Sequence, residues 1–345
     1  MTHPPTIREV ARRAGVSTAT VSRVLAGVGR PKPETVSIVQ AAVEALGYRP
    51  SGVARSLRMR HTATIGLVIT DIQNPFFPDL VRAADVAARE LGYSIILGSA
   101  AYDEDRALHY LDLMTERRVD GLVIASSQVS DVARDWLRVP PVPVVVVNAE
   151  PGSISAPVIT SDNRGGAVLA VEHLVMLGHR RIACIGGPAT FTASQPRLEG
   201  FRAACTAAGL SEAETPIFPG EGTVESGERA AARILSEAPG VTAIAAYNDL
   251  TAIGLLRALR AAGRGVPRDV SVVGFDDITA ASWTVPTLTT VAQQKATMGR
   301  LAIEYLAAMI GGQRDPADIT SIRLPTSLIV RESTGPAPVE PAVSG

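Results

Sequence analysis

Cysteine and aromatic residues are scarce in this chain of 345 residues, and both scarcities narrow what it can be. The two cysteines, Cys184 and Cys205, have neither the number nor the spacing of a zinc site or a disulfide framework. We therefore expect two buried thiols in a reducing compartment. Aromatics make up 4% of the residues while hydrophobic residues make up 46%, which predicts a core of small aliphatic side chains. The length suits two or three domains.

Long apolar runs and phosphate-binding loops are also missing. No stretch approaches the ~20 apolar residues of a membrane-spanning helix, and residues 1–10 lack the apolar segment of a secretory signal, so we expect a cytoplasmic protein without a membrane partner. No Gly-x-Gly-x-x-Gly follows a predicted strand, and no P-loop occurs. The five histidines lack zinc spacing, and we expect His173 and His179 at a helix end and at the surface. The sequence predicts no cofactor, no metal and no enzymatic activity.

Charge is distributed unevenly along the chain. Residues 1–60 hold ten lysines and arginines against three acids, a net charge of +7. The remaining 23 basic and 31 acidic residues give −8, so the overall charge of −1 hides a basic head on an acidic body. This asymmetry predicts a polyanionic partner at one end only.

Residues 1–50 have the pattern of a small helical domain. Thr6 and Glu9 fit a capping box that starts one helix, and Gly15 can end it in the left-handed conformation. Ser17 can cap a second helix, and a third is expected from about Pro33 to Leu46. Two short helices joined by a glycine-containing turn are typical of a helix-turn-helix, whose second helix enters the major groove of DNA.

The second predicted helix offers groups that read base edges. Arg23 could donate two hydrogen bonds to a guanine, and Thr18 and Ala19 could contact thymine methyl groups. The alternative, from these residues alone, is an ordinary three-helix unit with a solvated Arg23. The residues of the head that we expect to contact DNA are Thr6, Ser17, Thr18, Ala19, Thr20, Ser22 and Arg23.

Residues 51–61 form a basic segment between the head and the body. Ser51 to Arg58 could form a short helix, which would not be stable alone in water. With Arg55 and an apolar Leu57, such a helix could insert into a minor groove when DNA is bound. The alternative is a flexible basic linker, which spacing alone favours.

Strands and helices alternate after residue 61. Runs of β-branched residues favour parallel strands buried on both faces, and hence a doubly wound α/β body whose ligands lie beyond the carboxyl ends of the strands. The predicted strands are Thr64–Thr70, Ser94–Ser99, Asp120–Ala125, Val142–Asn148, Arg181–Gly186, Ala243–Tyr247 and Val270–Phe275.

Polar and aromatic side chains cluster where these strands end. Amides, a carboxylate, an arginine and aromatic rings together suit a polyhydroxylated ligand, because hydroxyls both donate and accept and a sugar's C–H face packs on a ring. In the pairs Asn248-Asp249 and Asp276-Asp277, the second residue could instead serve a cap or turn. The candidate ligand-binding residues are Asn74, Phe76, Phe77, Asn148, Arg197, Asn248, Phe275, Asp276 and Gln293.

The stretch from Thr6 to Leu25 closely resembles the head of the LacI/GalR family of bacterial regulators. The resemblance implies a homodimer that binds a pseudo-palindromic DNA operator, with Arg55 and Leu57 meeting the DNA in a paired hinge. Gly52 departs from a good hinge helix, because glycine costs about 0.5–1 kcal/mol relative to alanine. Further matching motifs, in family order, are Leu46–Pro50, Val53–Leu57, Val119–Leu122, Arg197–Phe201, Asp269–Asp277 and Leu288–Val291.

The resemblance also implies how the body is divided. It implies two lobes like those of periplasmic binding proteins, joined by crossings near residues 160–162, 290–292 and 324–326. We expect an effector-binding and dimerisation domain at 62–334, and a disordered tail at 335–345. An apolar helix stripe from Leu80 to Leu91 is more often core than interface, but the resemblance implies that part of this helix meets the dimer mate. The expected lobes are about 62–160 with 292–324, and 161–290 with 325–334.

The candidate site also resembles that of ribose-type binding proteins and regulators. Asn148-Ala149 departs from the usual Asp-Arg pair, which removes a carboxylate and a guanidinium and puts ribose itself in question. We therefore expect a neutral sugar or sugar-like polyol as effector of a DNA-binding repressor. The alternatives are a cytosolic sugar-binding protein and an α/β enzyme with a fused DNA-binding head.

Overall fold

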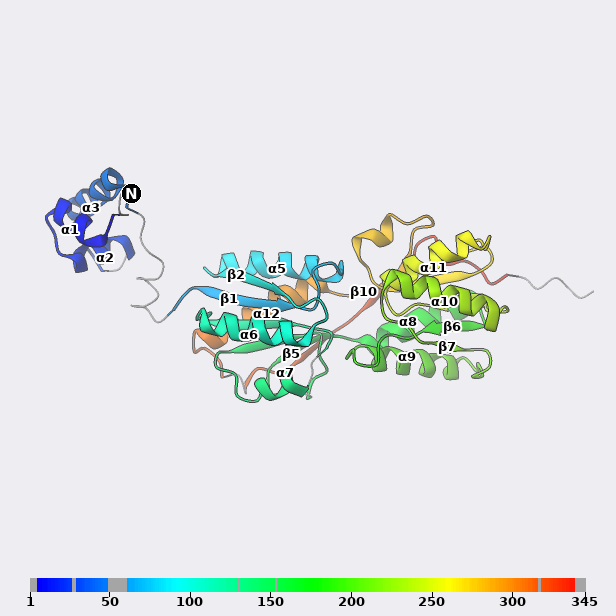
Figure 1. Ribbon diagram of the computed structural model, residues 1–345. Coiled ribbons are helices and arrows are strands. Elements are labelled where there is room, and N and C mark those ends of the chain that lie inside the picture. The colour runs from blue at the N-terminus through cyan, green and yellow to red at the C-terminus, as the bar shows by residue number, and fades with distance from the viewer. Residues whose placement is uncertain are drawn as a thin grey trace, which may run out of the picture. The chain divides into compact units, whose positions relative to one another are not determined.

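The computed structural model describes residues 5–26, 29–48, 61–128, 131–152, 154–315 and 318–338, and divides the chain into two compact units (Figure 1). The first unit is Met1–Ala63 and the second is Thr64–Gly345. The predicted hinge, including Gly52, Arg55 and Leu57, lies outside the described residues.

The described residues of the first unit form three helices around a small apolar core. The predicted caps are present: Gly15 adopts a φ of +64°, and the Ser17 hydroxyl accepts from the backbone N–H of Thr20 at 3.1 Å. Val10, Val21 and Val39 are fully buried where the helices meet. The helix-turn-helix prediction is therefore confirmed, with α1 at Ile7–Ala14, α2 at Thr18–Ala26 and α3 at Pro33–Leu46.

The second unit has two lobes, each with a six-stranded sheet between layers of helices (Figure 1). In the first lobe all strand pairs are parallel, in the order β11-β5-β4-β3-β1-β2. Its strands are β1 Thr64–Ile69, β2 Ser94–Ser99, β3 Gly121–Ala125, β4 Val144–Val147, β5 Val158–Ser161 and β11 Ile322–Leu324. Helices α5 (Phe76–Glu90) and α12 (Lys295–Ile310) pack on one face, and α6 (Glu104–Glu116) and α7 (Asp131–Trp136) lie on the other.

The second lobe repeats this plan in the order β12-β10-β9-β8-β6-β7, with only β12 antiparallel to its neighbour. Its strands are β6 Ile182–Ile185, β7 Ile217–Phe218, β8 Ala243–Ala245, β9 Ser271–Asp276, β10 Thr289–Ala292 and β12 Ser327–Ile329. Helices α8 (Asn163–Met176) and α9 (Ser194–Ala207) cover one face, and α10 (Val224–Glu237) and α11 (Asp249–Ala261) cover the other; a 3₁₀ turn, η1 (Thr279–Ser282), follows β9.

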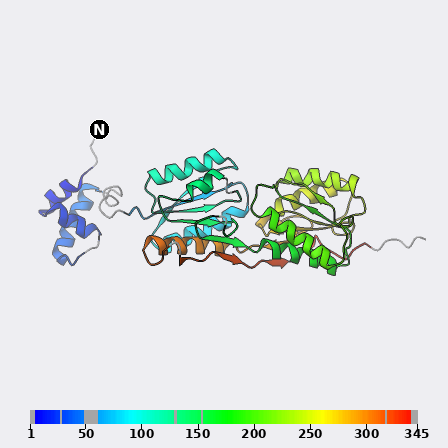
Figure 2. The ribbon, with the colours of Figure 1, turned by 90° about the horizontal axis from the view of Figure 1, so that it is seen from below.

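Three segments connect the lobes. The chain passes from β5 to α8, returns from β10 to α12, and passes again from β11 to β12. Figure 2 shows the last of these as the red strands running from one lobe to the other.

Several details differ from the sequence predictions. β5, β7, β10, β11 and β12 were not predicted; they have only two to four residues each, too few to show a period. His179 is not at the surface but fully buried, where its ring nitrogens meet Thr242, Ser271 and the carbonyl of Gly335. The chain stays hydrogen-bonded to this lobe as far as Ala337, beyond the expected start of the tail. No helix among the described residues is long and apolar enough to cross a membrane.

Candidate functional site

A small cavity of about 30 Å³ lies between the two lobes. One water molecule needs about 10–15 Å³ of such space, so a sugar-sized ligand requires the walls to move apart. The lobes contribute similar shares of its wall, and Gln293 enters from the second crossing. The lining residues are Asn74, Phe76, Tyr102, Ser127, Asn148, Phe191, Ala193, Arg197, Tyr247, Asn248, Asp276 and Gln293.

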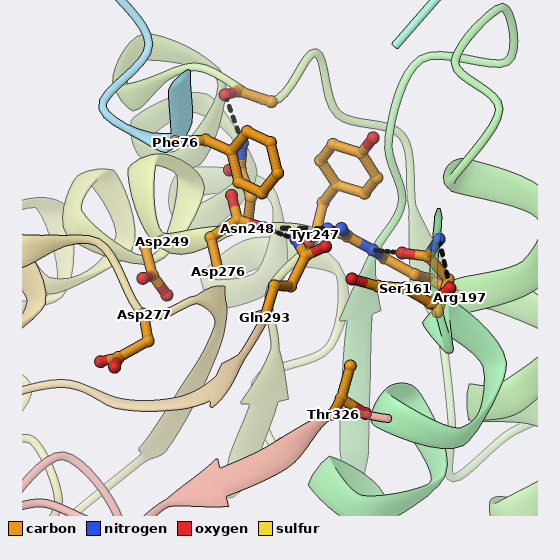
Figure 3. A network of polar contacts seen from close by, with 12 residues as sticks. Phe76, Ser161, Arg197, Tyr247, Asn248, Asp249, Asp276, Asp277, Gln293 and Thr326 are labelled. Atoms are coloured by element: carbon orange, nitrogen blue, oxygen red, sulfur yellow. Dashed lines mark hydrogen bonds and ion pairs between the residues drawn. The ribbon is translucent and has the colours of Figure 1, made fainter. Parts of the chain in front are cut away.

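Arg197, in the first turn of α9, is the central cation of this wall (Figure 3). Its Nε donates to Asn163 Oδ1 at 3.0 Å and its Nη1 donates to the carbonyl of Tyr247 at 2.6 Å. The guanidinium lies 3.6 Å from the centre of the Phe275 ring, and its Nη2 is 3.5 Å from Asp276 Oδ1. Because the guanidinium is held on several sides, its position is fixed before any ligand arrives.

Asp276 ends β9 and supplies the carboxylate of the cavity. Gln293 Nε2 donates to its Oδ1 at 2.6 Å, the same oxygen that Arg197 Nη2 contacts. Burial raises the pKa of Asp276 above the ordinary aspartate range, while Arg197, Gln293 and Lys295 partly offset this increase. Asp276 and Asp277 both have positive φ angles, +119° and +50°, so the backbone turns sharply at the cavity wall.

A second buried carboxylate, Asp249, holds this turn in place (Figure 3). Its Oδ2 accepts from the backbone N–H of Ile278 at 2.8 Å, and its Oδ1 accepts from the hydroxyl of Thr290 at 2.5 Å. Burial and the nearby Asp276 raise the pKa of Asp249 well above the usual value. The prediction that the second residue of this pair serves a turn agrees with these contacts.

Two buried side-chain oxygens in the wall have no partner within the described part of the chain, namely Asn148 Oδ1 and Gln293 Oε1. Both residues are more than nine-tenths buried. An unpaired buried acceptor costs about 1–3 kcal/mol, so a ligand that donates to these oxygens recovers that free energy. Together with the Asp276 carboxylate, they make the wall rich in acceptors.

The far side of the cavity is closed by contacts between the lobes. The rings of Tyr102 and Phe191 stack, with centroids 5.7 Å apart and planes 5° from parallel. The backbone N–H of Thr192 donates to the carbonyl of Ser127 at 2.9 Å, and its hydroxyl donates to the carbonyl of Asn148 at 2.7 Å. Opening of this edge would widen access to the cavity from that side.

The structure brings most of the predicted residues together, with two exceptions. Phe77 packs in the apolar core of the first lobe, edge-on to Phe76 with ring centroids 5.3 Å apart. Phe275 lies behind Arg197, in the core between β9 and α9, and supports the guanidinium from there. Seven of the nine candidates line the cavity: Asn74, Phe76, Asn148, Arg197, Asn248, Asp276 and Gln293.

Asn248 lines the cavity and also caps a helix. Its Oδ1 accepts from the backbone N–H and hydroxyl of Thr251, so it caps α11, and its Nδ2 donates to the carbonyl of Gly222 at 2.9 Å. Little hydrogen-bonding capacity is left for a ligand.

The sequence reasoning missed five lining residues. Tyr247 immediately precedes Asn248 at a strand end, so the rule that selected Asn248 could have found it. The other four lie in loops without a recognisable pattern, namely Tyr102, Ser127, Phe191 and Ala193.

In the first unit, α2 presents an exposed face. Thr18, Ala19 and Arg23 are exposed, while Thr20 and Ser22 are partly covered. Thr6 and Ser17 are exposed just before α1 and α2. Arg23 Nε is 3.4 Å from the carbonyl of Ala19, a weak contact that leaves the guanidinium available. No cluster of metal-ligating side chains occurs among the residues that the structure describes.

A helix-turn-helix unit followed by a two-lobed α/β body with an inter-lobe cavity defines a class of ligand-responsive regulators. Residues 6–51 match the model of bacterial regulatory proteins of the lacI family, and residues 171–334 match that of a periplasmic binding protein-like domain. The chain is 38% identical to the ribose operon repressor of Escherichia coli (strain K12) over 302 residues, covering 87% of this chain and 92% of that protein. The chain therefore belongs to the lacI family of bacterial regulatory proteins.

Two solved structures are similar over most of the chain. The Lac repressor dimer bound to operator and the anti-inducer ONPF is 29% identical, with a TM-score of 0.87, covering 96% of this chain and all of that one. A LacI family regulator from Enterococcus faecium with bound ribose is 31% identical, with a TM-score of 0.71, covering 79% of this chain and 99% of that one.

Proposed function

We propose that the protein is a sequence-specific transcriptional regulator, of the repressor type, whose operator affinity is controlled by a neutral sugar or polyol bound between its lobes. The main support for this proposal is that one chain combines the exposed face of α2 with a cavity between the lobes whose wall is rich in hydrogen-bond acceptors. The relatives named above are regulators rather than enzymes, which supports a non-enzymatic role in the cytoplasm.

DNA recognition is proposed to rest on α2. An exposed arginine on a recognition helix donates to both acceptors of a guanine edge, and Arg23 has that position. Thr18 and Ala19 beside it are small enough to meet thymine methyl groups. Arg55 and Leu57 remain sequence predictions for the hinge.

The proposed DNA-binding species is a homodimer on a pseudo-palindromic operator. Helix α5, its C-cap and the edge strand β2 of the first lobe leave large apolar side chains exposed to solvent, which a second copy would cover. The exposed side chains are Val86, Leu91, Ile96 and Leu97. The crystallised Lac repressor relative is a dimer on its operator, which supports this assembly.

The effector is proposed to donate hydrogen bonds to the acceptors of the wall. Hydroxyl groups can donate to Asp276, Asn148 and Gln293, and Phe76 offers a ring for the C–H face of a sugar. Ribose is bound to the Enterococcus faecium relative, which supports the sugar class.

Selection of random duplex DNA by the full-length protein tests the DNA-binding part, and anisotropy titrations of the selected site with pentoses, hexoses and polyols test the effector part. We expect an enriched pseudo-palindrome and a sugar that shifts operator affinity by about 5–150-fold. Failure to enrich any sequence would refute the regulator and favour a sugar-binding protein. Sugar turnover would favour the enzyme alternative.

A further inference from the structure

We propose that Lys295 is a positioning residue that ties the Asp276–Asp277 turn of the second lobe to α5 of the first lobe, and thereby holds the lobes closed around the effector. This inference rests on the proposed function for its effector. Lys295 is the first residue of α12, immediately after the crossing that carries Gln293.

The contacts of Lys295 reach both lobes. Its Nζ donates to the carbonyl of Asp277 at 2.6 Å, in the second lobe, and lies 3.3 Å from Asp79 Oδ2 on α5, in the first lobe. The side chain is 8% exposed, whereas that of Asp79 is 35% exposed. A buried ammonium needs both partners, because either alone leaves part of its charge uncompensated.

The turn that Lys295 contacts also sets the direction in which the Asp276 carboxylate points into the cavity. Arg331 binds the carboxylate of Asp277 at 2.7 Å, and Asp249 binds the backbone N–H of Ile278. Both of those contacts come from within the second lobe. Lys295 alone among these three reaches across, so it links the direction of Asp276 to the distance between the lobes.

Asp79, the partner of Lys295 in the first lobe, belongs to a tightly packed pair of helices. Helices α5 and α12 approach so closely that a Cβ at Gly299 would lie 2.3 Å from the carbonyl oxygen of Leu80. Phe76, which lines the cavity, is in the first turn of α5, one turn before Asp79. A displacement of Asp79 is therefore transmitted directly to the cavity wall.

Hydrogen exchange in the ligand-free, full-length protein tests the link without knowledge of the effector. The reporter is the Thr192 N–H, which donates to Ser127 across the cleft and is exposed when the lobes separate. We expect Lys295→Met and Asp79→Asn each to raise exchange in peptides covering this amide about tenfold, the effect of one lost charge-assisted hydrogen bond. The double variant should exchange no faster than Lys295→Met.

Arg300→Met is the matched control. Arg300 is on the same helix and pairs with Glu90 of α5 at 2.8 Å, but both partners belong to the first lobe. Hydrogen exchange at the Thr192 amide in Arg300→Met should equal that of the unchanged protein. Unaltered exchange in both Lys295→Met and Asp79→Asn, or effects that multiply in the double variant, would overturn the proposal. If Lys295→Met fails to fold, the exchange rates of Asp79→Asn and Lys295→Arg decide the question. Lys295→Arg should then exchange at Thr192 like the unchanged protein, because arginine keeps the positive charge.

Titration with D-ribose as the probe adds a functional readout. Lys295→Met should weaken its binding about tenfold, and Lys295→Arg should restore most of the affinity. If the unchanged protein binds no D-ribose or other sugar, the proposed effector class fails, but the exchange measurement still decides the role of Lys295. Normal sugar affinity in Lys295→Met would refute the link to the effector site.

Discussion

Replacing Arg197 by alanine should destabilise the second lobe and abolish effector binding together. The change removes the hydrogen bonds to Asn163 and Tyr247 and the stacking on Phe275. It also leaves Asp276, which is only 6% exposed, without its cationic partner. Breaking a buried ion pair by removing one partner costs about 3–5 kcal/mol, and the lost hydrogen bonds belong to the same network, so they do not add in full.

We therefore expect the free energy of unfolding to fall by about 3–5 kcal/mol, which lowers the melting temperature by about 2–4 °C for each kcal/mol. Thermal unfolding followed by circular dichroism measures this directly. Arg202→Ala is the matched control, because Arg202 lies on the same helix with an exposed side chain and should leave the melting temperature unchanged.

Binding must be separated from folding. Arg197→Lys keeps a charge near Asp276 but cannot satisfy Asn163, Tyr247 and Asp276 at once, because an ammonium lacks the planar fork of donors. We expect this variant to stay folded at room temperature and to bind the effector much more weakly in calorimetric titrations. Wild-type stability and affinity in Arg197→Ala would refute the assignment of this cavity.

Three further predictions follow from the site and the head. Burial raises the pKa of Asp276 in the folded protein, so Asp276 becomes charged only when the pH rises through this raised pKa. Over the same pH range the folded protein loses the stability that the protonated Asp276 contributes. Effector affinity should increase over that range, because the charged carboxylate is the stronger acceptor. Calorimetry at a series of pH values above the ordinary aspartate pKa should show this acid limb, and Asp276→Asn should flatten it. Tyr102→Ala removes the stack on Phe191 and should lower the activation barrier to effector release by about 0.5–1.5 kcal/mol, which stopped-flow measurements detect as a faster release rate. An unchanged release rate would mean that this edge does not gate the cavity. Arg23→Ala should relax base preference at one position per half-site by about 1–3 kcal/mol, whereas an equal loss on every DNA sequence would contradict base readout.

Sequence reasoning found the elements whose physical signals are local. Helix caps at Thr6 and Ser17 and buried β-branched strands such as Val144–Val147 depend on near neighbours in the chain, and the structure has them as expected. The short strands β7 and β12 have two and three residues, and their pairing depends on partners far away in the chain. No local pattern could have identified them.

The errors in the candidate site have the same origin. Phe76 and Phe77 are adjacent in the first turn of α5, and successive helical residues point about 100° apart, so only one can face the cleft. Phe275 and Asp276 are adjacent on a strand, where side chains alternate between faces. Which residue of each pair faces the ligand depends on the phase of the element, which a strand-end rule alone does not supply.

The hydrogen-bond inventory of the wall narrows the chemistry of the effector. Asn248 is used for capping, and Arg197 already has protein partners and a buried counter-ion. Acceptors remain open to a ligand, namely the Asp276 carboxylate and the unpaired oxygens of Asn148 and Gln293. An anionic ligand such as a sugar phosphate would bring a second negative charge beside Asp276, at a distance where like charges repel strongly in a buried site. A neutral polyol brings hydroxyl donors instead, so calorimetry should rank a free sugar well above its phosphate; the reverse order would mean that Arg197 releases Asp276 to bind the ligand anion.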